Sequence, residues 1–475
     1  MKKIIIVIVI VLGLLCLSVA HDVRASAAGK DIYNIMEFGA IGDGYTDNAA
    51  AINSAIESCS AGGGGTVVVP SGEFLTGTIH LKSGVRLYLE DGAIIKGHMD
   101  PDVYKSYSPT NDMSRYDSGD GTVNSNNSKD LRWNRALILG VGLSDVSIEG
   151  SGVIDGRHLY DPLGEEHMRG PHTILIAESE NIALSGITII NSANYAFMSY
   201  GIENASFVGL TIKEGWDGIH IRGGKDVVIN DCEFYTGDDA IAGGYWENMS
   251  ISRCQINSSC NGIRMIMPCD GLEISECRFY GPGMYPHRTS GPARRTNMLT
   301  AVLLQPGGWG KAYGDIENIH IHDLEIDNVA TPVMLVLNEG NDGKNILIEG
   351  ISARNVYKSA ISIESWRGGV YENAEFRNMN ISFKGHDDSS LSSLNVGQPP
   401  ADSRLLPCWA LYARNVRQLK MSDIEFCLDG TDFRPALLFD NIGEAVLKDV
   451  VYHKSKNKDS VMYFNSGKVT EIHTR

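Results

Sequence analysis

The middle of the chain alternates apolar and polar residues with a period of two, in units of about a dozen residues that each end in a turn-like stretch. Four units, "NIALSGITIINS", "NASFVGLTIKEG", "DVVINDCEFYTG" and "NMSISRCQINSS", begin at Asn181, Asn204, Asp226 and Asn248. A fifth unit, "GLEISECRFYGP", begins at Gly271, and the steps between the five units are 23, 22, 22 and 23 residues. Alternation followed by a turn predicts β-strands.

These repeats predict a solenoid, because a unit of this size cannot bury its own apolar face and must stack on its neighbours. Looser copies begin at Asn318, Asn345 and Asn373, and their longer steps indicate inserted loops. The helical half and the leucine-and-asparagine consensus of a leucine-rich repeat are both missing. The sequence therefore favours an all-β fold, a parallel β-helix.

The first 27 residues have the pattern of a bacterial export signal. Two lysines precede an uncharged apolar run from Ile4 to Val19, and small residues offer cleavage sites after Ala20 or Ala27. The run is shorter than the roughly 20 residues that a membrane-spanning helix needs. We therefore expect a secreted protein, extracellular or periplasmic, without stable membrane insertion after cleavage, in which residues 28–475 form a single β-helix domain.

The seventh position of the units predicts one interior column of apolar side chains. Its members are Ile187, Leu210, Cys232, Cys254, Cys277, Leu324, Ile351 and Met379. We interpret the three cysteines as small buried hydrophobic residues and not as metal or redox ligands. Because exported chains meet oxidising conditions, Cys260 with Cys269 and Cys408 with Cys427 are candidate disulfides.

Two segments before the repeats have other patterns. The stretch "GDGYTDNAAAINSAI" combines a glycine-rich loop with apolar residues at helical spacing and predicts a helix that caps the open end of the solenoid, within a segment at about 31–60. Thr46 and Asp47 are its candidate N-cap residues. The stretch from Asp100 to Arg132 is rich in Ser, Asn and Asp, which predicts a long surface loop.

Charge and composition narrow the class of partner. The formal net charge of the chain is -17, so the phosphates of nucleic acid would be repelled and no nucleic-acid partner is expected. An anionic sugar is not excluded, because one local basic pocket can hold it. The 52 glycines are typical of a turn-rich β architecture.

Three aspartates share neighbouring places in the repeat. Asp217, Asp239 and Asn261 each lie 13 residues after the first residue of their unit, and Asp238 precedes Asp239. In a parallel stack these positions form one column with a spacing of about 4.8 Å, so mutual repulsion should raise the pKa of at least one carboxyl. Such a cluster suits acid/base chemistry. Turn-capping aspartates and a calcium site are the alternatives.

At these residues the chain resembles glycoside hydrolase family 28, the polygalacturonase-like enzymes of the pectin lyase-like β-helix superfamily. The resemblance runs from about Tyr33 to at least Pro282 and is carried by the "GAIGDGYTDNAAAINSAI" stretch, "NSANYAF", "GWDGIHI" and "GDDAIA". It implies a right-handed parallel β-helix that hydrolyses glycosidic bonds of pectin-type, galacturonate-containing polysaccharides with inversion. It also implies a monomer that needs no metal or other cofactor.

The resemblance assigns roles to the three acids. Asp238 would be the general acid that protonates the leaving oxygen, and Asp217 with Asp239 would hold and deprotonate the attacking water. Two positions depart from the family: Asn261 stands in place of its active-site histidine, and Gly215 replaces an asparagine. The family's Arg-Ile-Lys signature, which grips the substrate carboxylate, has no clear match.

Candidate substrate contacts lie near the acids or in the insert that follows them. Arg264 and Arg294, the latter beside Arg295, are the candidate cations, and Asn261 and His220 are candidate hydrogen-bonding partners. Trp216 is the strongest candidate for a sugar-stacking wall, with Trp246 and Trp309 as others. We expect the insert from Pro282 to Trp309 to form a wall of the cleft.

Two other functions fit the same scaffold. One is a calcium-dependent polysaccharide lyase, which cleaves uronates by β-elimination and leaves an unsaturated product. The other is a non-catalytic, glycan-binding β-helix. In such a protein, replacement of Asp238 with Asn would have no effect.

Overall fold

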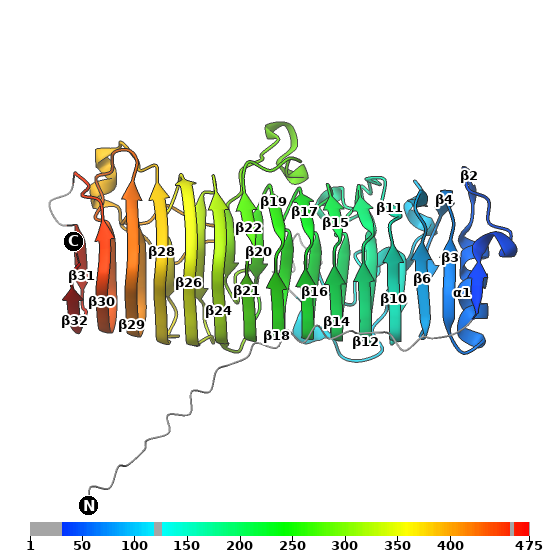
Figure 1. Ribbon diagram of the computed structural model, residues 1–475, viewed down its shortest axis with the longest axis horizontal. Coiled ribbons are helices and arrows are strands. Elements are labelled where there is room, and N and C mark those ends of the chain that lie inside the picture. The colour runs from blue at the N-terminus through cyan, green and yellow to red at the C-terminus, as the bar shows by residue number, and fades with distance from the viewer. Residues whose placement is uncertain (1–30, 118–125, 457–459, 475) are drawn as a thin grey trace, which may run out of the picture.

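Parallel strands wind into an elongated stack of coils that follows chain order from one end to the other (Figure 1). The computed structural model describes residues 31–117, 126–456 and 460–474. The predicted all-β solenoid is confirmed. The predicted export signal, residues 1–27, lies outside the described residues.

Each coil contributes strands to three parallel stacks. The first contains β5 (Ile79–His80), β9 (Arg135–Val141), β20 (Asn261–Met265), β23 (Thr300–Leu304), β25 (Thr331–Leu337), β27 (Ile361–Ser365) and β31 (Val461–Phe464). The second contains β1 (Ile32–Asn34), β3 (Gly65–Val69), β6 (Val85–Leu89), β10 (Ser144–Gly150), β21 (Cys269–Ser275) and β32 (Lys468–Ile472). The third contains β2 (Asp43–Asp47), β4 (Gly72–Thr76), β7 (Ala93–Gly97), β11 (Val153–Asp155), β13 (Thr188–Ile190), β15 (Thr211–Lys213), β17 (Glu233–Thr236), β19 (Gln255–Ser258) and β22 (Arg278–Tyr280).

Longer strands bend from one stack into the next. The first and second stacks are joined by β12 (His172–Ser185), β14 (Phe197–Val208), β16 (Ile219–Asn230) and β18 (Ile241–Ser252). The second and third are joined by β24 (Ile316–Asp327), β26 (Gly343–Val356) and β28 (Tyr371–Phe383). All three are crossed by β29 (Leu411–Leu428) and β30 (Leu437–Tyr452), and the short β8 (Lys105–Ser106) pairs antiparallel with β9.

The asparagines that open the repeat units form the corner between stacks. Asn181, Asn204, Asp226 and Asn248 all have φ between 51 and 56°, a left-handed conformation that Asn and Asp tolerate better than other side chains. The Asn204 amide donates to the Asn181 side-chain oxygen at 2.7 Å, and the Asn248 amide donates to the Asp226 carboxylate at 2.9 Å. These side-chain ladders stabilise the corner in each successive coil.

The interior column is buried as predicted, and Cys232, Cys254 and Cys277 are each 1% exposed. The two predicted disulfides are wrong, because all eight cysteines of the described residues are free. The physical reason is the path of each coil. Cys260 precedes a strand of the first stack whereas Cys269 begins a strand of the second. Cys408 lies shortly before β29, whereas Cys427 lies near the far end of that strand.

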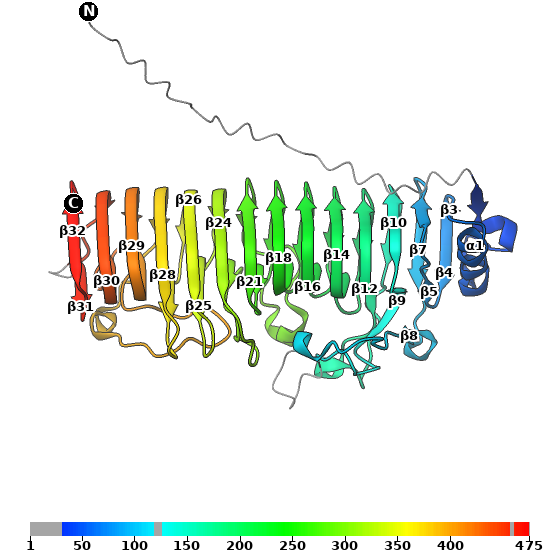
Figure 2. The same cartoon turned by 90° about the horizontal axis from the view of Figure 1, so that it is seen from below.

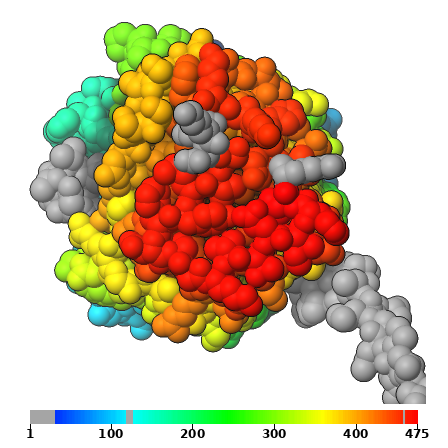
Figure 3. Space-filling view, turned by 90° about the vertical axis from the view of Figure 1, so that its left-hand side faces the viewer, coloured from blue at the N-terminus to red at the C-terminus, as the bar shows by residue number. Residues whose placement is uncertain are grey.

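The N-terminal end is covered by α1 (Ala49–Ala61), whose Ile52, Ala55 and Ile56 are buried against the first coils. The N-cap is Asn48 and neither of the predicted residues, although the Asp47 side chain still accepts a hydrogen bond from the Ala49 N–H at 2.9 Å. Figure 3 shows the opposite end, where residues of the last strands cover the end face. Among the described residues, no helix has the length and apolar character to cross a membrane.

Four long connections interrupt the coils, and in Figure 2 they project from the same side of the stack. Segment 98–134 contains η2 (Pro101–Val103) and η3 (Ser114–Tyr116), and segment 156–171 contains η4 (Glu165–His167). Segment 281–299 contains η5 (Arg288–Ala293), and segment 384–410 contains η6 (Ser389–Ser393). A further short helix, η1 (Ile35–Phe38), belongs to the N-terminal cap. These connections shape the site described next.

Candidate active site

The register of three adjacent coils brings the three aspartates together. Ile219 pairs with Ile241, and Ile241 pairs with Ile263, so the residues two positions before them, Asp217, Asp239 and Asn261, form one column. One carboxylate oxygen from each of the three aspartates lies within 4.8 Å of the others. The column therefore holds two carboxyls on successive coils, with that of Asp238 beside them.

The aspartates face a cleft with a volume of about 210 Å³. The coils form its floor, and all four long connections contribute to its walls. Among the residues that these connections supply are Asn126, Glu165, Arg169, His287, Arg295 and Asp402. The predicted surface loop at 100–132 therefore also lines the site, through Asn126.

A chain of hydrogen bonds positions Asp217, which is 3% exposed. The Arg222 Nε–H donates to His220 Nε2 at 3.1 Å, so the other ring nitrogen, Nδ1, carries the proton and donates to Asp217 Oδ2 at 2.7 Å. Burial lowers the pKa of His220 well below its usual value, and the Arg222 charge lowers it further. His220, which stacks on Tyr195 with ring centroids 4.7 Å apart, is thus a neutral partner that orients Asp217.

Asp217 and Asp238 differ in their electrostatic surroundings. Burial raises the pKa of Asp217 well above its usual value, and the charges of Asp238 and Asp239 raise it further. Burial also acts to raise the pKa of Asp238, but His287 and Arg169 outweigh it and the pKa is lowered. His287 Nε2 and Arg169 Nη2 each lie 3.6 Å from Asp238 Oδ2. In the free protein, Asp217 therefore holds a proton more readily than Asp238.

Asp239 is held by Asn261 and Arg264. The backbone N–H and the side-chain amide of Asn261 both donate to Asp239 Oδ1, at 3.0 and 2.9 Å, and Arg264 Nη1 donates to Oδ2 at 3.3 Å. Burial raises the pKa of Asp239, against the opposing charge of Arg264. Asn261 is 0% exposed. The hydrogen-bonding partner that the structure gives Asn261 is thus Asp239, and a contact of Asn261 with substrate stays a prediction.

Arg264 lines the cleft, as its place near the acids predicted. Its second guanidinium nitrogen donates to the Ala401 carbonyl at 2.9 Å, and the guanidinium carbon lies 5.1 Å from the centroid of the Trp309 ring. Trp309 is 40% exposed and also lines the cleft. Of the three tryptophans considered, this one is placed to stack against a sugar ring.

Three other predicted substrate contacts need correction. Trp216 is 1% exposed, and the guanidinium carbons of Arg169 and Arg288 lie 5.0 and 4.7 Å from its ring centroid, so it is a packing residue and not a sugar-stacking wall. Trp246 is buried too. Arg294 is exposed at the end of η5, outside the cleft, whereas its neighbour Arg295 lines the cleft.

Hydrogen bonds between two of the connections, and between a coil and a third connection, enclose the cleft. Segment 281–299 contacts segment 156–171 where Thr289 donates to Glu166 Oε2 at 2.6 Å, and Arg288 hydrogen-bonds His158. On another side, the Arg222 guanidinium donates to the Asn126 carbonyl at 2.7 Å. The predicted wall formed by the insert is therefore present in its first half, while Thr300–Leu304 returns to the coil as β23.

Sequence reasoning missed the residues that the connections supply. Arg169 pairs with Glu166 at 2.8 Å and approaches Asp238, and buried Glu165 lies on the same turn. Burial raises the pKa of Glu165 to about 7, although Arg169 lowers it. Nothing in the 22-residue period points to these residues. The available signal was the charged run "GEEHMRG" inside an interruption of the repeat.

Comparison with known proteins identifies related chains. A family model described as "Rhamnogalacturonase A/epimerase, pectate lyase-like" matches residues 32–280. A probable polygalacturonase from Vitis vinifera is 29% identical over 226 residues, which cover 44% of this chain and 43% of the relative. An exo-poly-alpha-D-galacturonosidase from Dickeya chrysanthemi is 27% identical over 261 residues, 46% of this chain and 42% of the relative. The chain thus spans less than half of the length of these two relatives.

A solved structure supports the fold independently. The Family 28 exopolygalacturonase of Yersinia enterocolitica superposes with a TM-score of 0.59 at 16% identity, over 92% of this chain and 78% of that chain. At this level of identity the likeness concerns the fold. It agrees with the observed stack of parallel coils.

Proposed function

The chain belongs to the rhamnogalacturonase A/epimerase, pectate lyase-like family, and from this membership we propose that it hydrolyses glycosidic bonds in pectin-type, galacturonate-containing polysaccharides. The observation that carries the proposal is the cluster of Asp217, Asp238 and Asp239, three carboxylates within 4.8 Å in an enclosed cleft. Two relatives bear the names of a polygalacturonase and a galacturonosidase, which supports this substrate class.

The acid and base roles are taken from the family resemblance, and the pKa shifts of the cluster indicate which proton must move when substrate binds. Asp238 is the general acid, as the family resemblance implies, and it is the most exposed of the three. Because Asp217 holds a proton more readily than Asp238 in the free protein, a proton must pass from Asp217 to Asp238 when substrate enters. That transfer leaves Asp217 as a carboxylate that accepts a hydrogen bond from His220. It thus prepares an acid and a base in one step.

The attacking water is held between Asp217 and Asp239, and the proton it loses passes to one of these carboxylates. The family resemblance implies that the reaction inverts the configuration at the anomeric carbon. The nearest oxygens of the three carboxylates lie closer than the roughly 6.5 to 9.5 Å usual between inverting carboxyl pairs, so the separation itself does not select this course.

The enclosed cleft supports attack at chain ends. Residues of all four connections line the cleft around the aspartates, and its volume of about 210 Å³ is small against the roughly 300 to 1,000 Å³ of common ligand sites. Such a pocket suits one terminal sugar unit better than the interior of a polymer. Two proteins similar to this chain are named as exo-acting enzymes.

A digest of polygalacturonate tests the proposed function. We expect purified protein to produce reducing ends in the presence of a chelator, with monosaccharide as the main early product and without an unsaturated product that absorbs in the ultraviolet. Proton NMR of the same digest identifies the anomer released first. Absence of new reducing ends on pectic polysaccharides contradicts hydrolysis, and an unsaturated product that the chelator abolishes indicates the lyase instead.

Arg295 is the proposed partner of the substrate carboxylate. Arg264 and Arg169 already pair with protein carboxylates, whereas no ion pair joins Arg295 to one in the described part of the chain. A charged hydrogen bond contributes about 1.5 to 3 kcal/mol. We therefore expect Arg295→Met to raise KM for polygalacturonate about 10- to 100-fold.

The adjacent residue supplies a matched control for that measurement. Arg294 is exposed outside the cleft, so Arg294→Met should leave KM within about twofold of the parent value. Equal effects of the two substitutions would mean that overall charge matters and that Arg295 has no specific role.

A further inference from the structure

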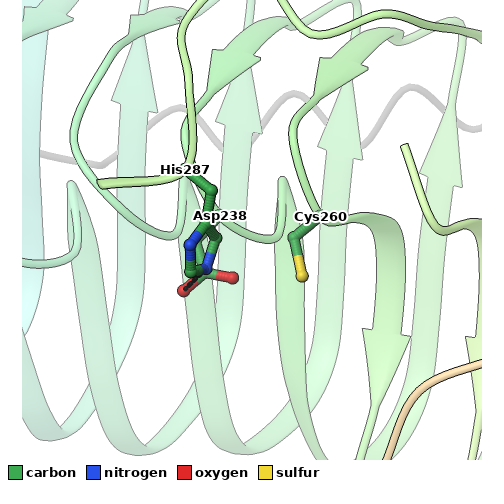
Figure 4. A group of neighbouring side chains, drawn as sticks. All are labelled: Asp238, Cys260 and His287. Atoms are coloured by element: carbon green, nitrogen blue, oxygen red, sulfur yellow. Dashed lines mark ion pairs between the residues drawn. The ribbon is translucent and has the colours of Figure 1, made fainter. Parts of the chain in front are cut away.

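Asp238, Cys260 and His287 bring three different kinds of metal-binding atom to one place. A carboxylate oxygen, the Cys260 Sγ and an imidazole nitrogen all lie within 4.8 Å of one another. Figure 4 shows them on separate parts of the chain: Asp238 and Cys260 on neighbouring coils, and His287 on the segment above them. The fold, and not one local loop, therefore creates the group.

The environment of the group is compatible with a bound ion. Cys260 is free and 4% exposed, and within the described residues the one polar group that contacts its sulfur is the Asn261 amide, at 3.5 Å. His287 Nε2 is the ring nitrogen that faces Asp238, while its Nδ1 is buried without a hydrogen-bond partner in the described residues. All three residues border the cleft, which provides an entry path.

The donor set selects the kind of ion. Zn²⁺ binds sulfur, imidazole nitrogen and carboxylate oxygen, usually with four ligands, whereas Ca²⁺ takes six to eight oxygens. In the oxygen-only alternative, the three-aspartate cluster, Asp239 already pairs with the Arg264 guanidinium. This fixed positive charge opposes a hard cation that needs Asp239 as a ligand.

We propose that Asp238, Cys260 and His287 form a three-ligand binding site for Zn²⁺ in which the fourth position is open to water or to a substrate oxygen. Binding displaces the thiol proton of Cys260 to solvent and the weak contact of Asp238 with Arg169. Because the ion occupies the carboxylate assigned as general acid, it inhibits turnover reversibly. This last consequence rests on the proposed function, whereas the binding itself does not.

Direct binding measurements test the site without any substrate. Zn²⁺ affinity is measured by competition with a chromophoric chelator, and Co²⁺ serves as a spectroscopic probe for a thiolate ligand. We expect Cys260→Ala to weaken Zn²⁺ binding roughly 100-fold or more and to remove the sulfur-to-cobalt charge-transfer band. Cys269→Ala, which removes a buried cysteine outside the group, should change neither.

Three outcomes would overturn the proposal: unchanged Zn²⁺ affinity in Cys260→Ala, no charge-transfer band in the parent, or equal loss of affinity in Cys269→Ala. His287→Gln, on a connection outside the coils, is the second variant should Cys260→Ala fail to fold, and it should weaken Zn²⁺ binding to a similar degree. Inhibition is measured separately, as the Zn²⁺ concentration that halves polygalacturonate hydrolysis. A parent that binds Zn²⁺ through Cys260 but hydrolyses nothing refutes the proposed function and leaves the site intact.

Discussion

Replacing Asp238 with Asn is expected to lower kcat on polygalacturonate by about 10²- to 10⁴-fold, the usual contribution of a general acid. Asn has nearly the same shape but carries no transferable proton, so the leaving oxygen would depart unprotonated. KM should change little, because the substrate contacts of Arg295 and Trp309 remain. Initial rates over a range of substrate concentrations separate the two parameters.

Asp226→Asn is the matched control for this substitution. Asp226 stands at an exposed corner of the same repeat, and Asn204 and Asn248 occupy the equivalent corners of the coils on either side. It should retain parental kcat. If Asp238→Asn keeps a rate within about tenfold of the parent, Asp238 is not the general acid. If the parent itself binds the sugar but shows no turnover, the non-catalytic alternative is favoured.

Replacing Glu165 with Gln is expected to stabilise the folded protein by about 3 kcal/mol at pH 8 and to have little effect at pH 4. Burial raises the pKa of Glu165 from 4.5 to about 7. Between these values the folded protein binds more protons than the unfolded chain, so stability falls as pH rises from about 4.5 to 7. A shift of this size corresponds to about 3 kcal/mol, and Gln remains neutral throughout.

Urea unfolding at several pH values measures this effect. The gap between the unfolding curves of Glu165→Gln and the parent should open as pH rises from 4 to 8. Glu247→Gln, an exposed residue on β18, provides the control and should follow the parent at every pH. A gap that does not depend on pH would show that the carboxyl of Glu165 is not the destabilising group.

The fold could be predicted because one local pattern recurs. Alternation and a 22- or 23-residue step were sufficient to place Cys232, Cys254 and Cys277 in the interior, since each coil repeats the pairing of the last. The disulfides could not be predicted in the same way. Eight residues separate Cys260 from Cys269, but the chain passes from the first stack to the second between them, and the spacing does not show that change of direction.

The site residues on the repeat could also be predicted from the sequence, whereas those on the connections could not. Asp217 and Asp239 could be placed together from the repeat alone, and Asp238 followed as their neighbour. Arg169, Glu165 and His287 could not, because they lie on connections without a period, and their approach to the acids depends on tertiary contacts. Arg294 was preferred to Arg295 for a related reason: within an irregular turn, sequence does not show which of two adjacent side chains points inward.

The coils carry the three carboxyls, whereas the four connections form the walls of the cleft. This separation affects how such proteins can diversify. The carboxyls are spaced by the hydrogen-bonded ladder of the backbone, which a change in an external segment leaves in place. Insertions, deletions or exchanges outside the ladder can therefore reshape the sugar pocket while the reacting groups keep their alignment. Grafting segments 281–299 and 384–410 from one relative onto another should therefore change the preferred glycan while the reaction stays the same.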